Sequence, residues 1–151
     1  MESAQIIKNI DELADFAKVF LSELQANQAQ ATVIALHGDL GAGKTAFVQE
    51  IGKILGVPET ITSPTFTIMR QYDVESEKFD SLVHIDAYRL ESPNEIGPLK
   101  IAELLTKPRT LICIEWAERL ISILEEQTIH LSLTINEDDS RTVKIGQNSR
   151  T

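Results

Sequence analysis

A glycine-rich segment, HGDLGAGKTAF at residues 37–47, contains the first residues of this chain whose spacing could do chemistry. Gly38, Gly43, Lys44 and Thr45 match the pattern G-x-x-x-x-G-K-[ST] in full. Backbone N–H groups can surround a chain of phosphates only where no bulky side chain blocks their approach, and most residues of this segment are small. The lysine would add a positive charge for the β- and γ-phosphates, and the threonine hydroxyl is an oxygen ligand that suits Mg²⁺. The pattern therefore predicts a phosphate loop that binds a nucleotide together with magnesium.

The surroundings of this segment favour that interpretation over a plain glycine turn. The apolar run ATVIALH (31–37) comes before it, and apolar residues at helical spacing follow it, so strand, loop and helix arrive in the required order. The unpaired N–H groups and the dipole at the start of the helix would attract an anion. We therefore expect the nucleotide to contact the loop and the residue that follows it. These residues are Gly38, Asp39, Leu40, Gly41, Ala42, Gly43, Lys44, Thr45 and Ala46.

Two carboxylates end apolar runs that are typical of buried strands. Asp86 ends LVHID, and Glu115 ends LICIE. Because ligands of open α/β sheets bind at the carboxyl ends of the strands, both side chains should lie beside the phosphate loop. A carboxylate in such a place costs free energy unless it is paired or binds a metal. We therefore expect Thr45, Asp86 and Glu115 to form the magnesium site. Which of the two acids holds the metal and which orients water stays open.

Other residues have weaker signals. The segment TSPTF (62–66) is either a switch-like loop near the γ-phosphate or a proline turn into a strand. Trp116, the only tryptophan, belongs either to the core or to the site. Cys113 lies inside an apolar run and is expected to be a buried, inert thiol. The histidines show no metal-binding spacing and are interpreted as structural; they are His37, His84 and His130.

Composition limits the classes of function. Fourteen basic residues against 23 acidic ones give a net charge of −9, and no basic cluster is present, so a broad nucleic-acid surface is disfavoured. The sequence has no apolar run of about 18 residues that would span a membrane. Its start has no signal-peptide pattern, and one cysteine fits a reducing compartment. A cytoplasmic protein without a membrane partner is expected.

The elements that must position these residues alternate between helix and strand. This predicts an α/β fold, one phosphate-loop domain over residues 1–151 with a mixed, mostly parallel sheet flanked by helices. An antiparallel C-terminal hairpin and a loose tail from about residue 146 complete it. Helices are expected over 9–25, from the glycine loop to Gly56, in the second half of 92–105, and over 117–124. Strands are expected over 31–37, 65–74, 82–88, 110–116 and in the pair 128–146.

With these segments in order, the chain resembles the TsaE family, the small bacterial ATPase of tRNA threonylcarbamoyladenosine biosynthesis. The resemblance rests on GDLGAGKT (38–45), SPTF (63–66), HIDAYRL (84–90) and IEWAERL (114–120). It implies that Lys44 binds phosphate, that Thr45 binds magnesium, and that Asp86 and Glu115 are the acids of the metal and water site. It also implies that Trp116 lies beside the active site and contributes to function, and that SPTF is the switch-like loop. The Gly-Pro pair at 97–98 departs from the continuous helix expected there.

The resemblance implies weak MgATP hydrolysis by the chain alone and action with the TsaB and TsaD proteins at adenosine 37 of tRNA. Contact with tRNA would be indirect, through that complex. Slow turnover is expected because no arginine finger is evident, Arg89 and Arg119 being the only candidates. The alternatives are a small-molecule kinase and a nucleotide-dependent interaction module. A GTPase is less favoured because TKPR (106–109) has arginine where a base-reading motif needs an acid. No motif identifies the adenine contacts.

Overall fold

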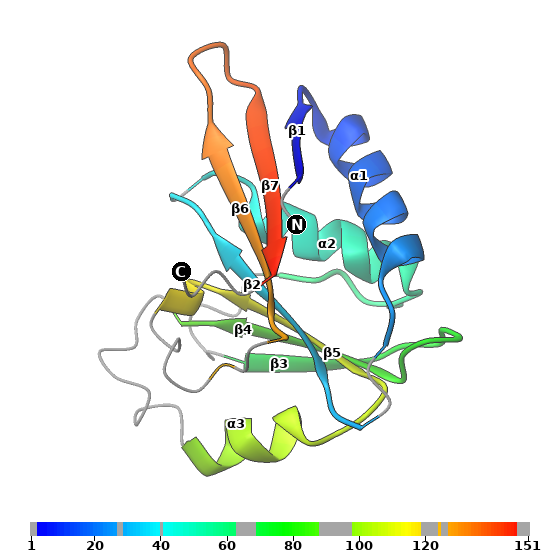
Figure 1. Cartoon of the computed structure of the whole chain (residues 1–151). Helices are drawn as coiled ribbons and strands as arrows, with labels where there is room; N and C mark the ends of the chain where they lie inside the picture. Colours follow the sequence, from blue (N-terminus) through cyan, green and yellow to red (C-terminus); the bar gives the residue numbers. More distant parts are fainter. Residues whose placement is uncertain are drawn as a thin grey trace.

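Helices and strands alternate along the chain, as the sequence predicts (Figure 1). The computed structural model describes residues 3–26, 29–39, 41–62, 69–87, 98–118, 124 and 127–147. The elements are β1 (Ser3–Ile7), α1 (Ile10–Glu23), β2 (Thr32–His37), α2 (Lys44–Ile54), β3 (Met69–Asp73), β4 (Ser81–Asp86), α3 (Pro98–Leu105), β5 (Thr110–Glu115), β6 (Ile129–Ile135) and β7 (Arg141–Gln147). The α/β class is therefore confirmed.

One seven-stranded sheet has the order β1-β7-β6-β2-β5-β4-β3. Its centre is parallel, because β2 pairs in parallel with β6 and β5, and β5 with β4. Antiparallel pairs close both sides, β7 with β6 and β1, and β3 with β4. The mixed sheet and its C-terminal hairpin are confirmed. Strand β1 is an addition, since no element was expected before residue 9.

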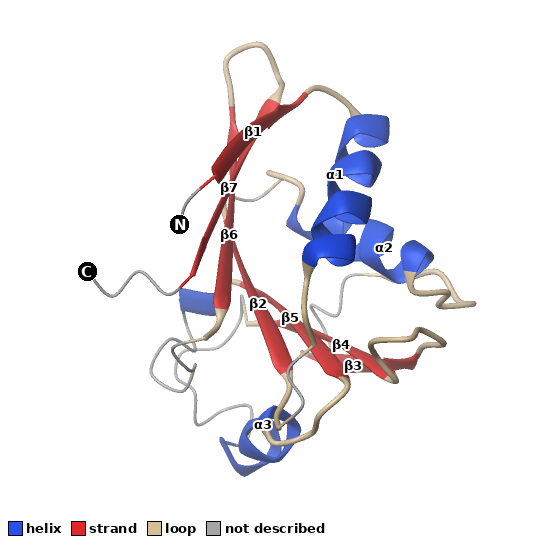
Figure 2. Ribbon diagram, turned by 45° about the vertical axis from the view of Figure 1, so that its right-hand side comes forward, coloured by secondary structure: helices blue, strands red, loops and turns tan. Residues whose placement is uncertain are grey.

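Helices cover both faces of the sheet, which explains why the centre of β2, residues 33–36, is apolar. Helices α1 and α2 lie together on one face, and α3 lies apart from them (Figure 2). Ile34 and Leu36 of β2 belong to the core cluster on the α1 and α2 face. Val33 and Ala35 point the other way and pack in a second cluster with residues of α3. A strand covered on both faces has no solvent side and needs no polar alternation.

Helix α1 begins as the sequence predicts. The Asn9 side chain accepts a hydrogen bond from the Glu12 backbone N–H at 2.9 Å, and Glu12 accepts one from the Lys8 N–H at 2.9 Å. This is close to a capping box and satisfies two backbone donors at the helix start. Along its inner side, Phe16 and Phe20 contact Phe47 of α2, with ring centroids 6.0 and 5.8 Å away. Helix α2 is thereby fixed against α1.

Several element boundaries differ from the sequence-based ones. Strand β7 continues to Gln147, so residues 146 and 147 belong to the sheet and not to a tail. Of the helix expected over 117–124, the structure describes a single turn at residues 117–118 and residue 124. The segment SPTF, Leu40, and the candidate fingers Arg89 and Arg119 lie outside the described residues. In the described part of the chain, no helix is long and apolar enough to cross a membrane.

Candidate functional site

The phosphate-loop segment connects the end of β2 to the first residue of α2. Gly43 is the N-cap of α2 and has φ +111°, a backbone conformation that other residues rarely adopt. A Cβ atom at Gly43 would meet no atom within 4 Å, so open space lies on that side of the loop. Gly38 is restricted differently: a Cβ there would be 2.5 Å from the Leu133 carbonyl oxygen of β6. The glycines thus provide both the bend of the loop and its close approach to the sheet.

Lys44 is held inside the loop by neutral groups. Its Nζ donates hydrogen bonds to the Gly38 carbonyl and, at 3.3 Å, to the Asp39 carbonyl. The residue is only 4% exposed. Burial lowers the pKa of Lys44 below its ordinary value, and nearby carboxylates, chiefly Glu115, partly oppose this shift. Within the described residues no carboxylate forms an ion pair with Lys44, so its charge is available to an anion in the loop.

Strand alternation brings the two acids to the face of the sheet that α2 covers. Leu82 of β4 and Cys113 of β5 belong to the α2-side core, and Asp86 and Glu115 have the same parity on those strands. Asp86 and Glu115 are also direct neighbours in the parallel register. Both are buried, at 5% and 3% exposure. The structure therefore brings the predicted acids together at the carboxyl ends of two adjacent strands.

Thr45 connects α2 to these acids. Its hydroxyl lies 2.9 Å from both carboxylate oxygens of Glu115. A hydroxyl and carboxylates are the hard oxygen ligands that Mg²⁺ prefers, and this ion usually keeps several waters and takes further ligands from substrate phosphates. No group of three His, Cys, Asp or Glu side chains in the described part of the chain could hold a metal. The Thr45 hydroxyl and the Glu115 carboxylate are by their chemistry ligands that fit magnesium bound together with a nucleotide.

His84 makes a contact in this cluster that was not predicted from the sequence. It is fully buried, and its Nε2 lies 2.5 Å from Glu115 Oε2. Its Nδ1 has no hydrogen-bond partner in the described part of the molecule. The interpretation of all three histidines as structural thus missed a direct contact with a candidate metal ligand. The signal was available, since His84 lies two residues before Asp86 and therefore on the same strand face.

Trp116 lies beside Lys44. The Lys44 Nζ is 4.0 Å from the centroid of the Trp116 ring, a cation–π contact. Trp116 has φ +59°, which is uncommon for a residue other than glycine and re-aims the side chain directly after β5. The ring also packs partly against the α3-side core. The sequence alone left Trp116 open between core and site; it contacts both.

The other two histidines form a separate cluster at the end of β2. His37 Nε2 lies 2.8 Å from His130 Nδ1, and the rings stack with centroids 5.1 Å apart. His37 Nδ1 is 3.3 Å from Glu118 Oε2. Burial, followed by the proximity of His37, lowers the pKa of His130. These contacts support a structural interpretation of His37 and His130.

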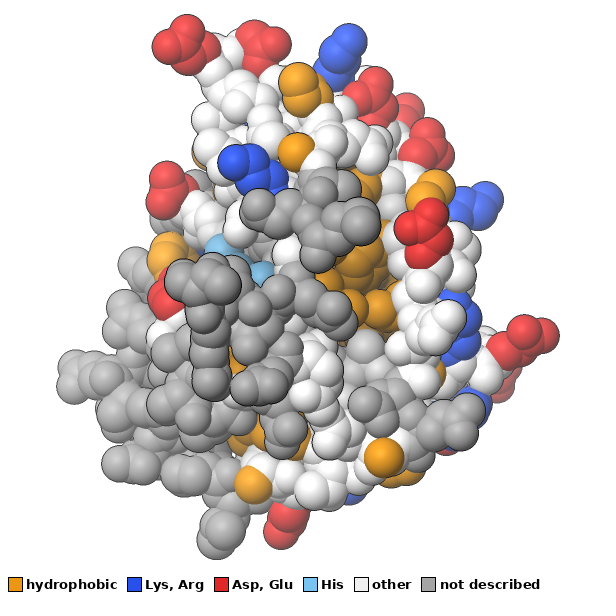
Figure 3. Space-filling view, viewed as in Figure 1, with side chains coloured by type: hydrophobic (Ala, Val, Ile, Leu, Met, Phe, Trp, Pro, Cys, Tyr) orange, Lys and Arg blue, Asp and Glu red, His pale blue; other side chains and the backbone are white. Residues whose placement is uncertain are grey.

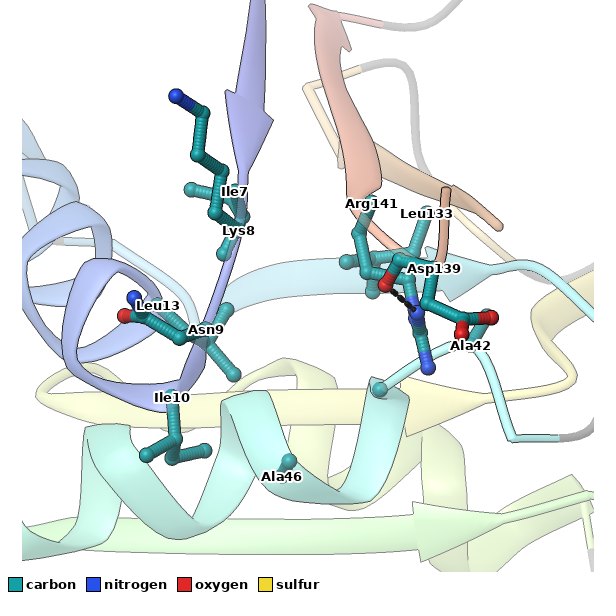
Figure 4. A pocket seen from close by; sticks show the side chains of 11 residues that line it. Ile7, Lys8, Asn9, Ile10, Leu13, Ala42, Ala46, Leu133, Asp139 and Arg141 are labelled. Atoms are coloured by element: carbon teal, nitrogen blue, oxygen red, sulfur yellow. Dashed lines mark hydrogen bonds between the residues drawn. The ribbon is translucent and has the colours of Figure 1, made fainter. Parts of the chain in front are cut away.

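A cavity of about 240 Å³ adjoins the loop (Figure 4). On one side it is lined by the end of β1 and the start of α1, including Ile10, which is 56% exposed. On the other side Arg141 of β7 reaches over the loop and donates a hydrogen bond to the Gly41 carbonyl at 3.3 Å. Ala42, Gly43 and Ala46 of the predicted nucleotide-binding segment also contribute to the lining. Sequence reasoning missed Ile10 and Arg141, because segments more than 100 residues apart form this cavity and no local motif marks them.

Comparison with known proteins agrees with this geometry. The model of the family described as threonylcarbamoyl adenosine biosynthesis protein TsaE matches residues 7–143. A Rickettsia bellii protein named tRNA threonylcarbamoyladenosine biosynthesis protein TsaE is 37% identical over 146 residues, which cover 96% of this chain and 95% of the relative. A Treponema pallidum protein of the same name is 38% identical over 117 residues, 77% of this chain and 82% of the relative.

A solved structure has the same fold. The crystal structure of Bacillus subtilis YdiB matches with a TM-score of 0.74 and 24% identity, covering 99% of this chain and 87% of that one. At this identity the match establishes the fold alone, and the sequence relatives establish the family. The phosphate loop, the paired strand-end acids and these matches lead to one conclusion: this chain belongs to the TsaE family of threonylcarbamoyl adenosine biosynthesis proteins.

Proposed function

We propose that this chain binds and hydrolyses MgATP in the formation of the threonylcarbamoyl modification on adenosine 37 of tRNA. The observation that carries the proposal is the contact between the Thr45 hydroxyl and the Glu115 carboxylate, at 2.9 Å, beside a glycine loop and a buried lysine. The named function of the family supports the link to tRNA modification. The net charge of −9 supports an indirect contact with tRNA, made through the partner proteins TsaB and TsaD.

Each residue of the cluster has a distinct part in this proposal. Lys44 would leave the loop carbonyls and contact the β- and γ-phosphates. Thr45 and Glu115 would hold magnesium, with Asp86 beside them, and the ion would neutralise charge on the phosphates. Whichever of Asp86 and Glu115 does not bind the ion would orient the water molecule that attacks the γ-phosphate, in line with the leaving oxygen. Positioning and electrostatics would supply most of the rate enhancement.

The cavity beside the loop is the place we propose for the nucleoside. Gly43 and Ala46 of the predicted nucleotide-binding segment also line this cavity. A nucleoside bound in the cavity would therefore place its triphosphate in the loop. The exposed Ile10 provides an apolar surface for a base, and Arg141 crosses the loop at Gly41. In the described residues, no arginine contacts Thr45 or Glu115. Slow turnover by the chain alone is proposed from the sequence, in which no arginine finger is evident, and the candidates Arg89 and Arg119 lie outside the described residues.

Calorimetric titration with ATP and Mg²⁺ tests the assignment. Lys44→Ala should weaken ATP binding by about 10- to 100-fold or more, because a hydrogen-bonded charge on the phosphates is lost. Lys53→Ala is the matched control, since Lys53 lies on the same helix with a side chain that is 73% exposed. It should bind ATP as the wild type does. Equal affinity of Lys44→Ala and wild type would contradict the proposed site.

A further inference from the structure

We propose that His84 is a positioning residue for magnesium binding, acting through Glu115. The proposal rests on the proposed function, because it assigns a role to a neighbour of the candidate metal ligand. His84 Nε2 is 2.5 Å from Glu115 Oε2, and both side chains are buried, at 0% and 4% exposure. His84 itself lies too deep to contact a nucleotide at the surface of the loop. Its effect on a ligand therefore passes through the carboxylate.

The donors around Glu115 explain why the carboxylate needs this histidine. An ionised carboxylate only accepts hydrogen bonds, and a hydroxyl has a single hydrogen to donate. Thr45 lies 2.9 Å from both oxygens but can donate to only one of them at a time. His84 Nε2–H supplies the second hydrogen bond, to Oε2. Without it, Thr45 would be the only one of these two side-chain donors left to the buried carboxylate, and one donor restrains rotation less than two.

The hydrogen on His84 can be placed from its surroundings. Because Glu115 Oε2 accepts, Nε2 must carry the hydrogen, and Nδ1 has no partner in the described part of the chain. Hydrogen bonds to a ligating carboxylate fix its orientation, and their loss commonly lowers metal affinity about 10- to 100-fold. His84 thus holds Oε2 and leaves the carboxylate oriented toward Thr45.

Substitution of His84 separates this role from simple packing. His84→Leu removes the donor, whereas His84→Gln returns an amide N–H near the former position of Nε2, and His84→Asn is too short to do so. ADP affinity of each variant is measured by calorimetry with and without Mg²⁺. In His84→Leu we expect the gain in affinity from Mg²⁺ to fall about 10-fold or more, with magnesium-free affinity unchanged. His84→Gln should recover most of the gain, and His84→Asn should not.

The control is Cys113→Ala, which removes a buried side chain directly opposite His84 in the β4–β5 register. It should keep the full magnesium effect. If His84→Leu keeps the full magnesium effect, or loses magnesium-free ADP affinity to the same extent, the inference is wrong. If the wild type binds no nucleotide, the proposed function and this inference are both wrong. If the wild type binds nucleotide and only the His84→Leu result differs from the expectation, the inference alone is wrong.

A second measurement does not depend on how the His84 variants fold. Nitrogen-15 NMR of the wild-type histidines reports which imidazole nitrogen carries the hydrogen. We expect His84 to be the Nε2–H tautomer in the free protein, and its signal to move in Glu115→Gln and on addition of MgADP. An Nδ1–H tautomer, or a signal insensitive to Glu115→Gln, would overturn the inference.

Discussion

Lys44 of the candidate site is held by neutral groups that a ligand can replace. Lys44 donates to the carbonyls of Gly38 and Asp39 and lies against the Trp116 ring. Replacing these contacts by contacts with a phosphate costs little free energy compared with breaking a buried ion pair. Burial lowers the pKa of Lys44, but the surrounding carboxylates oppose this effect. Among the described residues, the Lys44 side chain is therefore held in the loop without an ion pair to a carboxylate.

Trp116 fluorescence should report binding directly. Trp116 is the only tryptophan, and its ring contacts the Lys44 ammonium at 4.0 Å. If Lys44 moves to the phosphates, the charge over the ring changes, and tryptophan emission should shift when MgATP is added. Lys44→Ala keeps the tryptophan and should show no shift at the same MgATP concentration. Saturation with MgATP, seen by calorimetry, without any change in wild-type emission would contradict this picture.

At the level of elements, the site depends on how α2 is fixed between the sheet and α1. The first turn of α2 provides Lys44 and Thr45, and Phe47 follows on the buried side of the helix. Phe47 is fully buried and contacts two phenylalanine rings of α1. The sheet supplies the other residues of the site: His84 and Asp86 lie on β4, and Glu115 lies on β5. A shift of α2 would therefore separate Thr45 from Glu115.

Phe47→Ala should destabilise the fold by about 3–5 kcal/mol, because it removes a buried ring and leaves a cavity between the two helices. Urea unfolding followed by far-UV circular dichroism measures this change in the free energy of unfolding. Val19→Ala on α1 is the control, since Val19 is 55% exposed and its loss should change stability by less than about 0.5 kcal/mol. A similar small loss in Phe47→Ala would show that the aromatic contacts contribute little.

For the molecule as a whole, charge and pH set the conditions under which it works. Acidic side chains lie over the β6–β7 turn and along α1, with separate lysines and arginines between them (Figure 3). The described residues of this face form no continuous basic patch of the kind that a nucleic-acid surface needs.

Stability should fall in mild acid partly because of His130. Burial, and secondly His37, lowers the pKa of His130 below its ordinary value of 6.5. The unfolded chain therefore binds a proton at a pH where folded His130 is still neutral, and the free energy of unfolding decreases as the pH falls through this window. His130→Gln removes the effect, so its stability should change less than that of the wild type between about pH 7 and pH 5. Equal slopes in urea unfolding would contradict the prediction.

Turnover should depend on the assembled system more than on the chain alone. We expect slow ATP hydrolysis by the purified chain and faster hydrolysis with TsaB and TsaD present, since no arginine finger is evident in the sequence. Glu115→Gln should hydrolyse ATP more slowly, by about 100-fold or more, and fail to support repeated rounds of tRNA modification. If Glu115→Gln supports repeated rounds, the chain acts as a nucleotide-dependent interaction module. Brisk turnover without partners would contradict the slow-turnover proposal.

Much of this molecule follows from local sequence patterns. The spacing of Gly38, Gly43, Lys44 and Thr45 is sufficient to predict the loop, because each residue type there satisfies a backbone or phosphate requirement of its own. Apolar periodicity predicts α1 and the buried strands, because burial on one helical side or on both sheet faces leaves a repeating pattern. The same periodicity predicts that Asp86 and Glu115 end buried strands, since each ends such a run, and the structure places them there.

Tertiary structure decided the relations that no single segment contains. The register between β4 and β5 places Asp86 opposite Glu115 and, one step back on the same face, His84 against the Glu115 carboxylate. The cavity beside the loop joins Ile10 to Arg141, which only the folding of β1 and β7 brings together. Residue type and spacing determine local geometry and chemistry. Contacts between distant strands depend on sheet order and register, which arise from the packing of the whole chain.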